Sequence, residues 1–422
     1  MYTDEVCKRL PYAFVWSLYH PLLDTSITRN TTNDKTTFSI TLSDGARYDN
    51  LKLGFTGSVP GRQTTIFFKP DDSCTVIKEQ YIDSDRRFFE GSILKIIHAS
   101  GDFPGFVRLK WSEYVKNGGQ RLAVSKRSTT RFKTRLVMQD KGTPLDSVKT
   151  VRELLMILYD VLEVTRILHR TWHIIHRDIS PGNILVTDSA RSFPNTSQTS
   201  DLSFSESIIK PGSEPTRTRL LLADFEFAED KRYEEGVPIF MACMLRSKIY
   251  PAGKHDLPPI PAIHSGLYQH YKQRYPERMK WFGQNNTEQE VKIPKGSTLS
   301  DSKFEHHLRY DAESVFWVLT WWLIRAKPQD DKRSPHIPHP YWDNLTSEED
   351  SRHDYFISRS QINSDSFHPA YKALYDLWDD MREHLVADFD HSKDEMKKHP
   401  EYLHEVFQRL ILNFLHYKTE RK

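Results

Sequence analysis

The sequence predicts an α+β fold in which a small strand-rich part precedes a larger helical part. Short β-branched and aromatic runs alternate with turn residues between about residues 46 and 140. The periodicity of apolar residues becomes helical from about residue 147 onward. The chain of 422 residues is long enough for one large domain or two moderate ones.

Three strands and one helix are predicted in the strand-rich part. The strands are TTIFFKP (64–70), CTVIKEQY (74–81) and TRLVMQD (134–140), and the DDS segment between the first two predicts a hairpin. The helix covers residues 86–100, where apolar side chains recur at helical spacing. Residues 1–45 form an N-terminal extension to which the sequence assigns no role.

The helical part begins with a long buried helix, predicted from about residue 147 to 170. Residues 191–219 follow it and contain eleven Ser or Thr and three Pro among 29 residues. Such a composition cannot bury enough apolar surface, which predicts a disordered insertion. A second, irregular insertion rich in Pro, Gly, His and Lys is predicted over about 247–303, and the clearest closing helix covers 400–417.

Composition excludes several classes of protein. The 59 Lys and Arg nearly balance the 57 Asp and Glu, which leaves a net charge of +2. A nucleic-acid binder needs a concentrated basic surface, so no nucleic-acid partner is expected. The most apolar run, residues 314–324, is far shorter than the roughly 20 residues that span a bilayer, so no membrane partner is expected either.

The three cysteines, Cys7, Cys74 and Cys243, are far apart and odd in number. This pattern indicates neither a disulfide framework nor a zinc cluster. The N-terminus has no apolar signal core, and unpaired cysteines fit a reducing compartment. We therefore expect an intracellular protein, cytoplasmic or nuclear.

Lys78 and Glu90 are the first candidates for chemistry. Lys78 lies between Ile77 and Glu79 on a predicted strand, and Glu90 lies on the helix that follows. A strand lysine paired with a helix glutamate can hold the α- and β-phosphates of a nucleotide. Taken alone, Lys78 is also compatible with an ordinary surface lysine on an edge strand.

The stretch IIHRDISPGNILV, residues 174–186, places polar residues between two aliphatic pairs. Asp178 could accept a proton from an attacking hydroxyl, and Asn183 could bind magnesium through its amide oxygen. Pro181 stiffens the turn between them. Further along, LLLADFEFAED delivers Asp224 at the end of a buried strand, where a carboxylate is a natural magnesium ligand.

A strand lysine, a helix glutamate, HRDxxxxN and DFx occur in the order of the protein-kinase motifs. The chain resembles the fungal-type protein kinase family, a divergent branch of the eukaryotic protein-kinase fold. The resemblance rests on RLVMQDKGTPL, HRDISPGNILV, DFEFA, GVPIFMA and DAESVFWVLTWW. It implies a two-lobed fold, with a β-rich N-lobe and hinge over 46–141 and a helical C-lobe over 142–422. It also implies that ATP and Mg²⁺ are the cofactors.

The resemblance also implies catalytic and metal-binding roles. Lys78 and Glu90 would form the phosphate-holding pair, and Asp178 would be the catalytic base. Asn183 and Asp224 would bind the metal. Arg177 would read a charged group on the activation segment; because Tyr233 is the only hydroxyl there, Glu234 or Glu235 is expected to pair with it.

The nucleotide-binding roles that the resemblance implies fall on the strands and the hinge. Gly61 would lie over the phosphates and Ile66 over the adenine ring. Met138 would close the back of the adenine pocket, with the hinge formed by Gln139, Asp140 and Lys141. Asp311, which opens the most apolar helix, would hold the backbone of the catalytic loop.

The sequence departs from the kinase pattern at several positions. Gly54, Gly57 and Gly61 do not have the G-x-G-x-x-G spacing. Glu226 replaces the glycine after Asp-Phe, and Ser180 replaces the lysine expected two residues after the catalytic aspartate. In addition, Met244 replaces a glutamate expected near the end of the activation segment.

Three functions are compatible with these motifs. The first is an active protein kinase that uses ATP and magnesium and acts on Ser or Thr hydroxyls of a protein partner. The second is a non-catalytic nucleotide-binding module, which the irregular glycine loop and Ser180 favour. The third is a small-molecule phosphotransferase of the choline- or aminoglycoside-kinase kind, which the D-F-E sequence favours. The joint presence of Lys78, Asp178, Asn183 and Asp224 favours the first.

Overall fold

The computed structural model divides the chain into two compact units. One comprises Met1–Lys95 and Val107–Lys141, and the other comprises Ile96–Phe106 and Gly142–Lys422. The residues that the structure describes are 24–32, 35–57, 63–70, 75–84, 89–126, 129–193, 199–230, 258–284, 307–326, 328, 339–346, 362–390 and 399–420.

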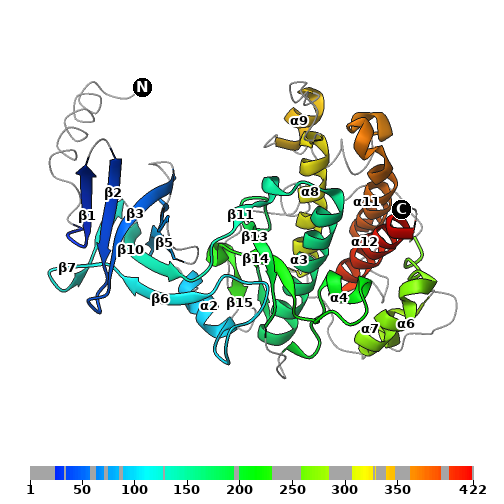
Figure 1. Ribbon diagram of the computed structural model, residues 1–422, viewed down its shortest axis with the longest axis horizontal. Helices are drawn as coiled ribbons and strands as arrows, with labels where there is room; N and C mark the ends of the chain where they lie inside the picture. Colours follow the sequence, from blue (N-terminus) through cyan, green and yellow to red (C-terminus); the bar gives the residue numbers. More distant parts are fainter. Residues whose placement is uncertain are drawn as a thin grey trace. The chain divides into compact units, whose positions relative to one another are not determined.

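The first unit is built on a curled antiparallel sheet (Figure 1), in the order β1-β2-β3-β4-β5-β10-β6 with β9 paired to β10. These strands are β1 (Ile27–Thr32), β2 (Lys35–Thr41), β3 (Arg47–Thr56), β4 (Thr65–Phe68), β5 (Val76–Asp83), β6 (Leu109–Tyr114), β9 (Ala123–Lys126) and β10 (Thr129–Met138). A separate hairpin joins β7 (Lys116–Asn117) to β8 (Gln120–Arg121). The three predicted strands correspond to β4, β5 and β10, and β4 pairs with β5 as the hairpin required.

The sheet also includes strands that the sequence did not assign. β1 and β2 lie within residues 1–45 and continue the sheet beyond β3. After β2, the backbone N–H of Ser43 donates to Glu113 Oε2 on β6 at 2.9 Å. This bond joins segments from opposite ends of the strand order, which is what a curled sheet requires.

One face of β5 and β10 forms the interior of the curled sheet. Ile77 and Val137 are fully buried there in a cluster with residues of β2, β3 and β4. Farther along the same face, Arg135 bonds to Glu79 at 2.6 Å and to Glu113 at 3.0 Å. Because side chains alternate along a strand, Lys78 lies on the opposite face.

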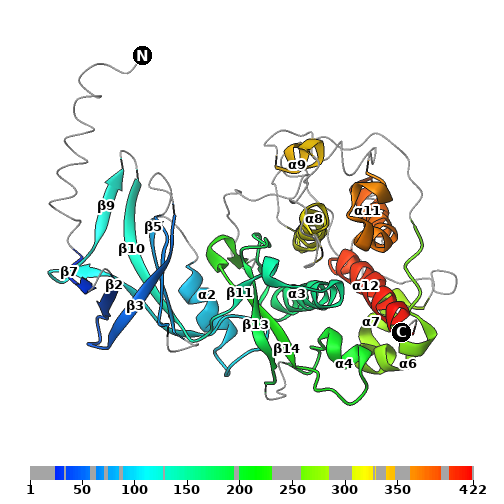
Figure 2. The same ribbon diagram turned by 45° about the horizontal axis from the view of Figure 1, so that its top comes forward.

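The second unit is organised around a long helix, α3 (Val151–Trp172). The hydroxyl of Thr150 accepts a hydrogen bond from Glu153 N at 3.1 Å, which caps the start of the helix. His173 adopts a left-handed conformation, φ 56°, at its end. Figure 2 shows α8 (Arg309–Arg325), α11 (Tyr375–Asp390) and α12 (Tyr402–Glu420) on one side of α3. The strand-rich part followed by helices confirms the α+β class.

Shorter elements complete the second unit. A three-stranded sheet has the order β11-β13-β14, and β12 pairs with β15. The strands are β11 (Thr143–Pro144), β12 (Ile174–Ile175), β13 (Ile184–Arg191), β14 (Thr218–Leu222) and β15 (Glu229–Asp230). The helices are α4 (Ser205–Ile209), α6 (Ser265–Arg274), α7 (Pro276–Phe282) and α9 (His339–Thr346), with 3-10 turns η1 (Leu145–Ser147), η3 (Phe225–Phe227), η5 (Ser364–Ser366) and η6 (Pro369–Leu374). The helix predicted over 86–100 is α2 (Glu90–Ile97).

The prediction of a disordered insertion over 191–219 is wrong for residues 199–219. This segment contains α4, and its side chains Phe204 and Ile208 are fully buried. Its polar groups bond to α3: Ser205 N donates to Asp160 Oδ1 at 2.8 Å, and Thr218 Oγ1 donates to Asp160 Oδ2 at 2.6 Å. A few apolar anchors and one buried carboxylate therefore order a stretch whose average composition predicted disorder.

The predicted irregular insertion over 247–303 is likewise wrong for residues 258–284, which contain α6 and α7. Arg278 on α7 is buried and forms ion pairs with Glu163 of α3 and Glu405 of α12. Glu405 also pairs with Arg409 at 2.7 Å. These buried charges, which composition does not reveal, fix α7 against the central helices.

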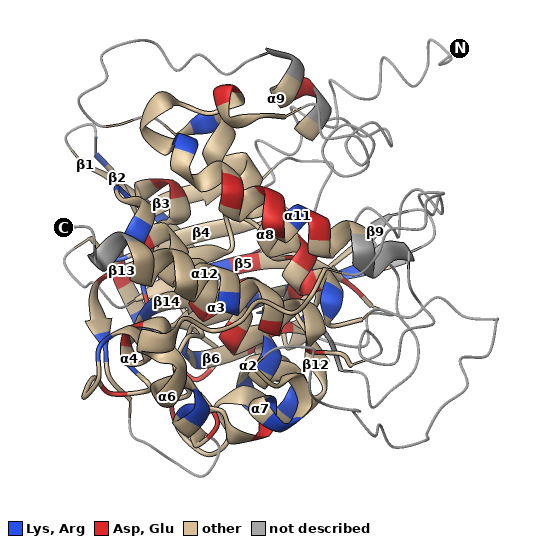
Figure 3. Ribbon diagram, turned by 90° about the vertical axis from the view of Figure 1, so that its right-hand side faces the viewer, with Lys and Arg blue, Asp and Glu red and all other residues tan. Residues whose placement is uncertain are grey.

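Figure 3 shows several acidic residues along α11. Asp376, Asp379, Asp380 and Glu383 are spaced three, four and seven residues apart, so they lie on one face of this helix. Burial and the three neighbouring carboxylates raise the pKa of Asp380 to about 6. This face of the second unit is therefore negatively charged.

Asp160 should make the stability of the protein depend on pH. Its burial raises the pKa of its carboxyl to about 7, well above the ordinary value for an aspartate. Its contribution to stability is therefore present at acidic pH and is lost as pH rises through about 7. We expect the stability of Asp160→Asn relative to the wild type to rise by about 2–4 kcal/mol between pH 5 and pH 8, because the wild type loses stability over this range and the neutral amide does not titrate. Urea denaturation at both pH values measures this; a difference that does not change with pH would contradict it.

Candidate active site

The first unit contains the predicted lysine–glutamate pair. Nζ of Lys78 lies 2.7 Å from Oε2 of Glu90, and the two residues are only 4% and 2% exposed. Lys78 is on β5 and Glu90 is the first residue of α2. At Gly91, a Cβ atom would lie 2.9 Å from Leu136, so the absence of a side chain lets α2 approach the sheet. The pair is thus a buried, close contact rather than a surface lysine on an edge strand.

The neighbours of Lys78 on the sheet are apolar. Ile66 of β4 and Leu136 of β10 are both directly opposite Lys78 across the strands. Side chains at directly paired positions lie on the same face of a sheet. Ile66, which was predicted to cover the adenine ring, therefore flanks the lysine predicted to hold the phosphates.

The predicted hinge follows β10. Met138 is the last residue of β10 and is buried. In the hinge, the backbone N–H of Gln139 donates to the carbonyl oxygen of Arg108 at 2.9 Å. Asp140 is buried, and its carboxylate accepts a hydrogen bond from the backbone N–H of Arg108 at 2.8 Å and another from the Arg108 guanidinium at 2.8 Å. The Lys141 ammonium lies 4.8 Å from the centre of the Phe68 ring. Asp140 thus fixes the backbone of this segment, a role that the sequence did not predict.

Asp311 holds the loop that carries the predicted base, in the second unit. It lies in the first turn of α8 and is 1% exposed. Its Oδ2 accepts from His176 N at 3.0 Å and its Oδ1 accepts from Arg177 N at 2.9 Å. Arg177 has a left-handed backbone, φ 69°, which is unfavourable for a non-glycine residue. The two bonds offset this strain, as expected for backbone held at a functional site.

His176 connects this loop to the segment that contains Asp224. It is fully buried, and its Nδ1 accepts from Asp178 N at 3.3 Å. The proton is therefore assigned to Nε2, which donates to Ala223 O at 3.1 Å. The His176 ring also contacts the ring of Phe225, with 4.7 Å between centroids. The sequence pattern predicted no role for His176, although this residue directly precedes Arg177 and Asp178.

Asn183 fixes the carboxylate of Asp178. Its amide nitrogen donates to the backbone O and to Oδ2 of Asp178, each at 2.9 Å. These two acceptors establish the orientation of the amide, because only its nitrogen can donate. The amide oxygen is therefore turned away from Asp178 and is the atom that could bind a cation.

Asp224 lies next to Asn183 along the sheet. Strands β13 and β14 pair Ile184 with Leu222, and Ala223 N donates to Asn183 O at 3.0 Å. Asp224 has φ 62° and ψ 70°, so it also has a left-handed backbone, like Arg177 in the HRD loop. Glu226, two residues after Asp224, replaces the glycine that the kinase pattern predicts and is buried within η3.

The oxygen donors here fit magnesium better than a softer metal. An amide oxygen of Asn183 and a carboxylate of Asp224 are hard ligands, and Mg²⁺ typically takes one or two protein carboxylates and completes its shell with phosphates and water. Within the described ranges, no group of three or more His, Cys, Asp or Glu could hold a metal ion. A dedicated all-protein metal cage is therefore not what these residues form.

Two sets of predicted residues fall outside the described residues. Gly61 lies in residues 58–62, and the part of the activation segment that contains Tyr233, Glu234, Glu235 and Met244 lies in residues 231–257. The pairing expected for Arg177 and the position expected for Gly61 therefore stay predictions.

In the part of the chain that is described, no helix is long and apolar enough to cross a membrane.

The strand-rich unit, the helical unit and the HRD loop held by Asp311 are compatible with a protein-kinase-like fold. Residues 112–258 match the family described as fungal protein kinase. The serine/threonine-protein kinase haspin homolog hrk1 of Schizosaccharomyces pombe (strain 972 / ATCC 24843) is 24% identical over 155 residues, which cover 34% of this chain and 32% of that protein. The chain thus spans about a third of the length of this relative. The matched segment, about a third of the chain, is thus similar to the fungal protein kinase family.

Proposed function

We propose that this protein is an ATP- and magnesium-dependent kinase that phosphorylates Ser or Thr hydroxyls of a protein. The observation that carries the proposal is the double hydrogen bond from Asn183 to Asp178, inside a loop whose backbone is held by Asp311. This arrangement orients a carboxylate and an amide oxygen at once. A module that only binds nucleotide has no physical need to orient a base.

Asp178 is the base in this proposal. As the substrate hydroxyl oxygen forms its bond to the γ-phosphorus, Asp178 takes the hydroxyl proton, and ADP leaves with the electrons of the broken phosphorus–oxygen bond. Oδ2 of Asp178 already accepts a hydrogen bond from Asn183.

Lys78, Asn183 and Asp224 serve the nucleotide. Lys78, held by Glu90 at 2.7 Å, would bind the α- and β-phosphates. Asn183 and Asp224 would bind magnesium through the amide oxygen and the carboxylate. When bound, the metal supplies positive charge that neutralises the phosphates.

Sequence features and one similarity, rather than contacts in the structure, favour a protein hydroxyl as the phosphate acceptor. The arginine of HRD, Arg177, and the GVPIFMA segment favour a protein substrate over a small molecule. The description of the haspin homolog as a serine/threonine-protein kinase supports the acceptor type. Ser180, in place of a lysine, removes one charge that would steady the transferred phosphate, so a low turnover is expected. The two units as kinase N-lobe and C-lobe are part of the same proposal.

Nucleotide binding should stabilise the protein only when magnesium is present. We expect the melting temperature to rise with ATP plus Mg²⁺, and Asp224→Ala to lose most of that rise because one metal ligand is removed. Asp188→Ala, at an exposed position of β13, is the matched control and should keep the full rise. Thermal denaturation with ATP and either Mg²⁺ or EDTA measures the effect. An unchanged rise in Asp224→Ala would remove Asp224 from the metal site.

A further inference from the structure

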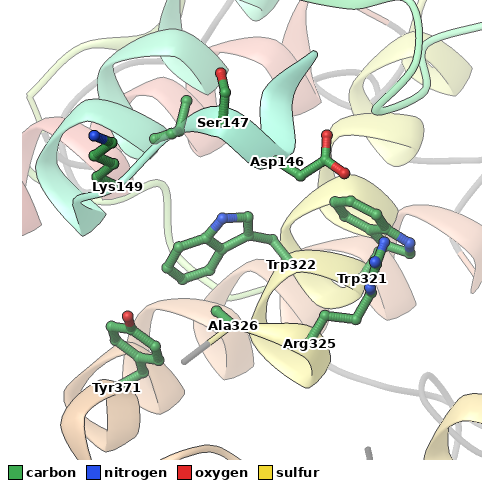
Figure 4. Close-up of a pocket in the computed structure, with 9 residues that line it drawn as sticks. Asp146, Ser147, Lys149, Trp321, Trp322, Arg325, Ala326 and Tyr371 are labelled. Atoms are coloured by element: carbon green, nitrogen blue, oxygen red, sulfur yellow. The ribbon is translucent and has the colours of Figure 1, made fainter. Parts of the chain in front are cut away.

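A cavity of about 370 Å³ lies in the second unit, at the ends of α3 and α8 that are remote from the catalytic loop. It is lined by η1 and the residues just before α3, the last turn of α8, and η6 (Figure 4). Trp322 is separated from Asp311 by about 16 Å along α8, at about 1.5 Å per residue. The cavity is therefore distinct from the proposed phosphotransfer site.

Two hydrogen-bond donors on buried side chains open onto this cavity and have no protein acceptor among the described residues. Trp322 is 6% exposed and Tyr371 is 9% exposed, and their ring centroids lie 5.1 Å apart. Figure 4 shows the indole nitrogen of Trp322 on the ring edge turned toward Ser147, and the Tyr371 hydroxyl pointing into the same space. Among the described residues, neither group has a hydrogen-bond acceptor. Buried Trp and Tyr normally find a polar partner, and an indole N–H can only donate.

The charged groups of the lining are mainly cationic. Lys149 and Arg325 have no carboxylate within ion-pair distance among the described residues, and Asp146 is the one acid of the lining. The Arg325 guanidinium stacks over Trp321 at 4.5 Å and lies 5.7 Å from Trp342. A guanidinium that stacks through its face keeps its N–H groups, which lie at its edge, available to an anion.

We propose that this cavity binds a small aromatic carboxylate. The flat body of the ligand packs against the rings of Trp322 and Tyr371. Its carboxylate accepts hydrogen bonds from the indole N–H and the phenol O–H and is neutralised by Lys149 or Arg325. The volume falls in the range of about 300–1,000 Å³ that small-molecule sites occupy. A cationic ligand would meet two cations and one acid, so the lining disfavours it.

The test uses naphthoate, its neutral isostere naphthamide, and choline, with isothermal titration calorimetry on the full chain. We expect saturable binding of naphthoate and at least about tenfold weaker binding of naphthamide, because the charged hydrogen bonds are lost. Choline should not bind. Equal affinity for naphthamide, tighter binding of choline, or no saturable binding of naphthoate up to millimolar concentration would overturn the proposal.

Substitutions locate the site. Trp322→Phe and Tyr371→Phe each remove one donor and keep a ring, and each should weaken naphthoate binding about tenfold. Lys149→Met removes one charge, so it should weaken naphthoate binding about tenfold and leave the binding of the neutral naphthamide unchanged. Tyr268→Phe, which removes a hydroxyl on α6, is the matched control and should have no effect. Unchanged naphthoate binding in all three variants would place the ligand elsewhere. A peptide with a free C-terminal Phe that binds more tightly than naphthoate would overturn the small-molecule assignment.

Discussion

Asp178→Asn should lower the turnover number by about 10²–10⁴-fold, the usual contribution of a positioned base. The amide oxygen of the new side chain can still accept the hydrogen bond that Asn183 donates at 2.9 Å, so the loop should keep its geometry. What is lost is the ability to take the proton from the hydroxyl. ATP affinity should barely change, because the contacts assigned to the nucleotide lie on other residues.

Steady-state kinetics at saturating ATP, together with ATP titration, separate the two effects. Asp188→Asn, which neutralises an exposed carboxylate on β13, is the matched control and should retain wild-type turnover. Normal turnover with weakened ATP affinity in Asp178→Asn would mean that Asp178 binds nucleotide and is not the base.

Among the substitutions proposed here, Asp311→Ala should produce the largest loss of folding stability. The carboxylate accepts the backbone N–H groups of His176 and Arg177, and His176 is fully buried. Removing it leaves two donors without their partner, each at a cost of about 1–3 kcal/mol. We expect the free energy of unfolding to fall by about 2–5 kcal/mol and phosphotransfer to fall as well, since Arg177 loses the bond that holds its left-handed backbone.

Urea denaturation measures this loss. Asp376→Ala, at an exposed position in the first turn of α11, matches the chemical change and should alter stability by less than about 0.5 kcal/mol. Asp311→Asn keeps one acceptor oxygen and should fall between the wild type and Asp311→Ala. Wild-type stability in Asp311→Ala would show that the two hydrogen bonds do not hold the loop.

Local sequence patterns predicted the elements whose residues contact near neighbours in the chain. The strand runs that became β4, β5 and β10 show β-branched and aromatic residues between turns, and α3 shows a clear helical period. Asp178 and Asn183 are five residues apart, so their relation could be inferred from the order of residues in one loop. The pairing of Lys78 with Glu90 needed only the strand and the helix that follows it.

Long-range contacts could not be inferred in the same way. Residues 199–219 look disordered by composition, yet Ser205 and Thr218 both donate to Asp160, about 45 and 58 positions away. α7 is fixed by Arg278, whose partners Glu163 and Glu405 lie more than a hundred positions away in each direction. No local pattern marks such partners, because only the packed helices bring these charges together.

One experiment tests directly whether the protein transfers phosphate to Ser or Thr hydroxyls of a protein. Purified protein is incubated with γ-labelled ATP and Mg²⁺, alone and with generic protein substrates, and labelled protein is hydrolysed for phosphoamino-acid analysis. We expect the label on phosphoserine or phosphothreonine. The labelling should require Mg²⁺ and should be absent in Asp178→Asn. Label that is transferred only to choline or an aminoglycoside would contradict a protein kinase. No transfer at all, with Mg²⁺-dependent ATP binding intact, would identify a non-catalytic nucleotide-binding module instead.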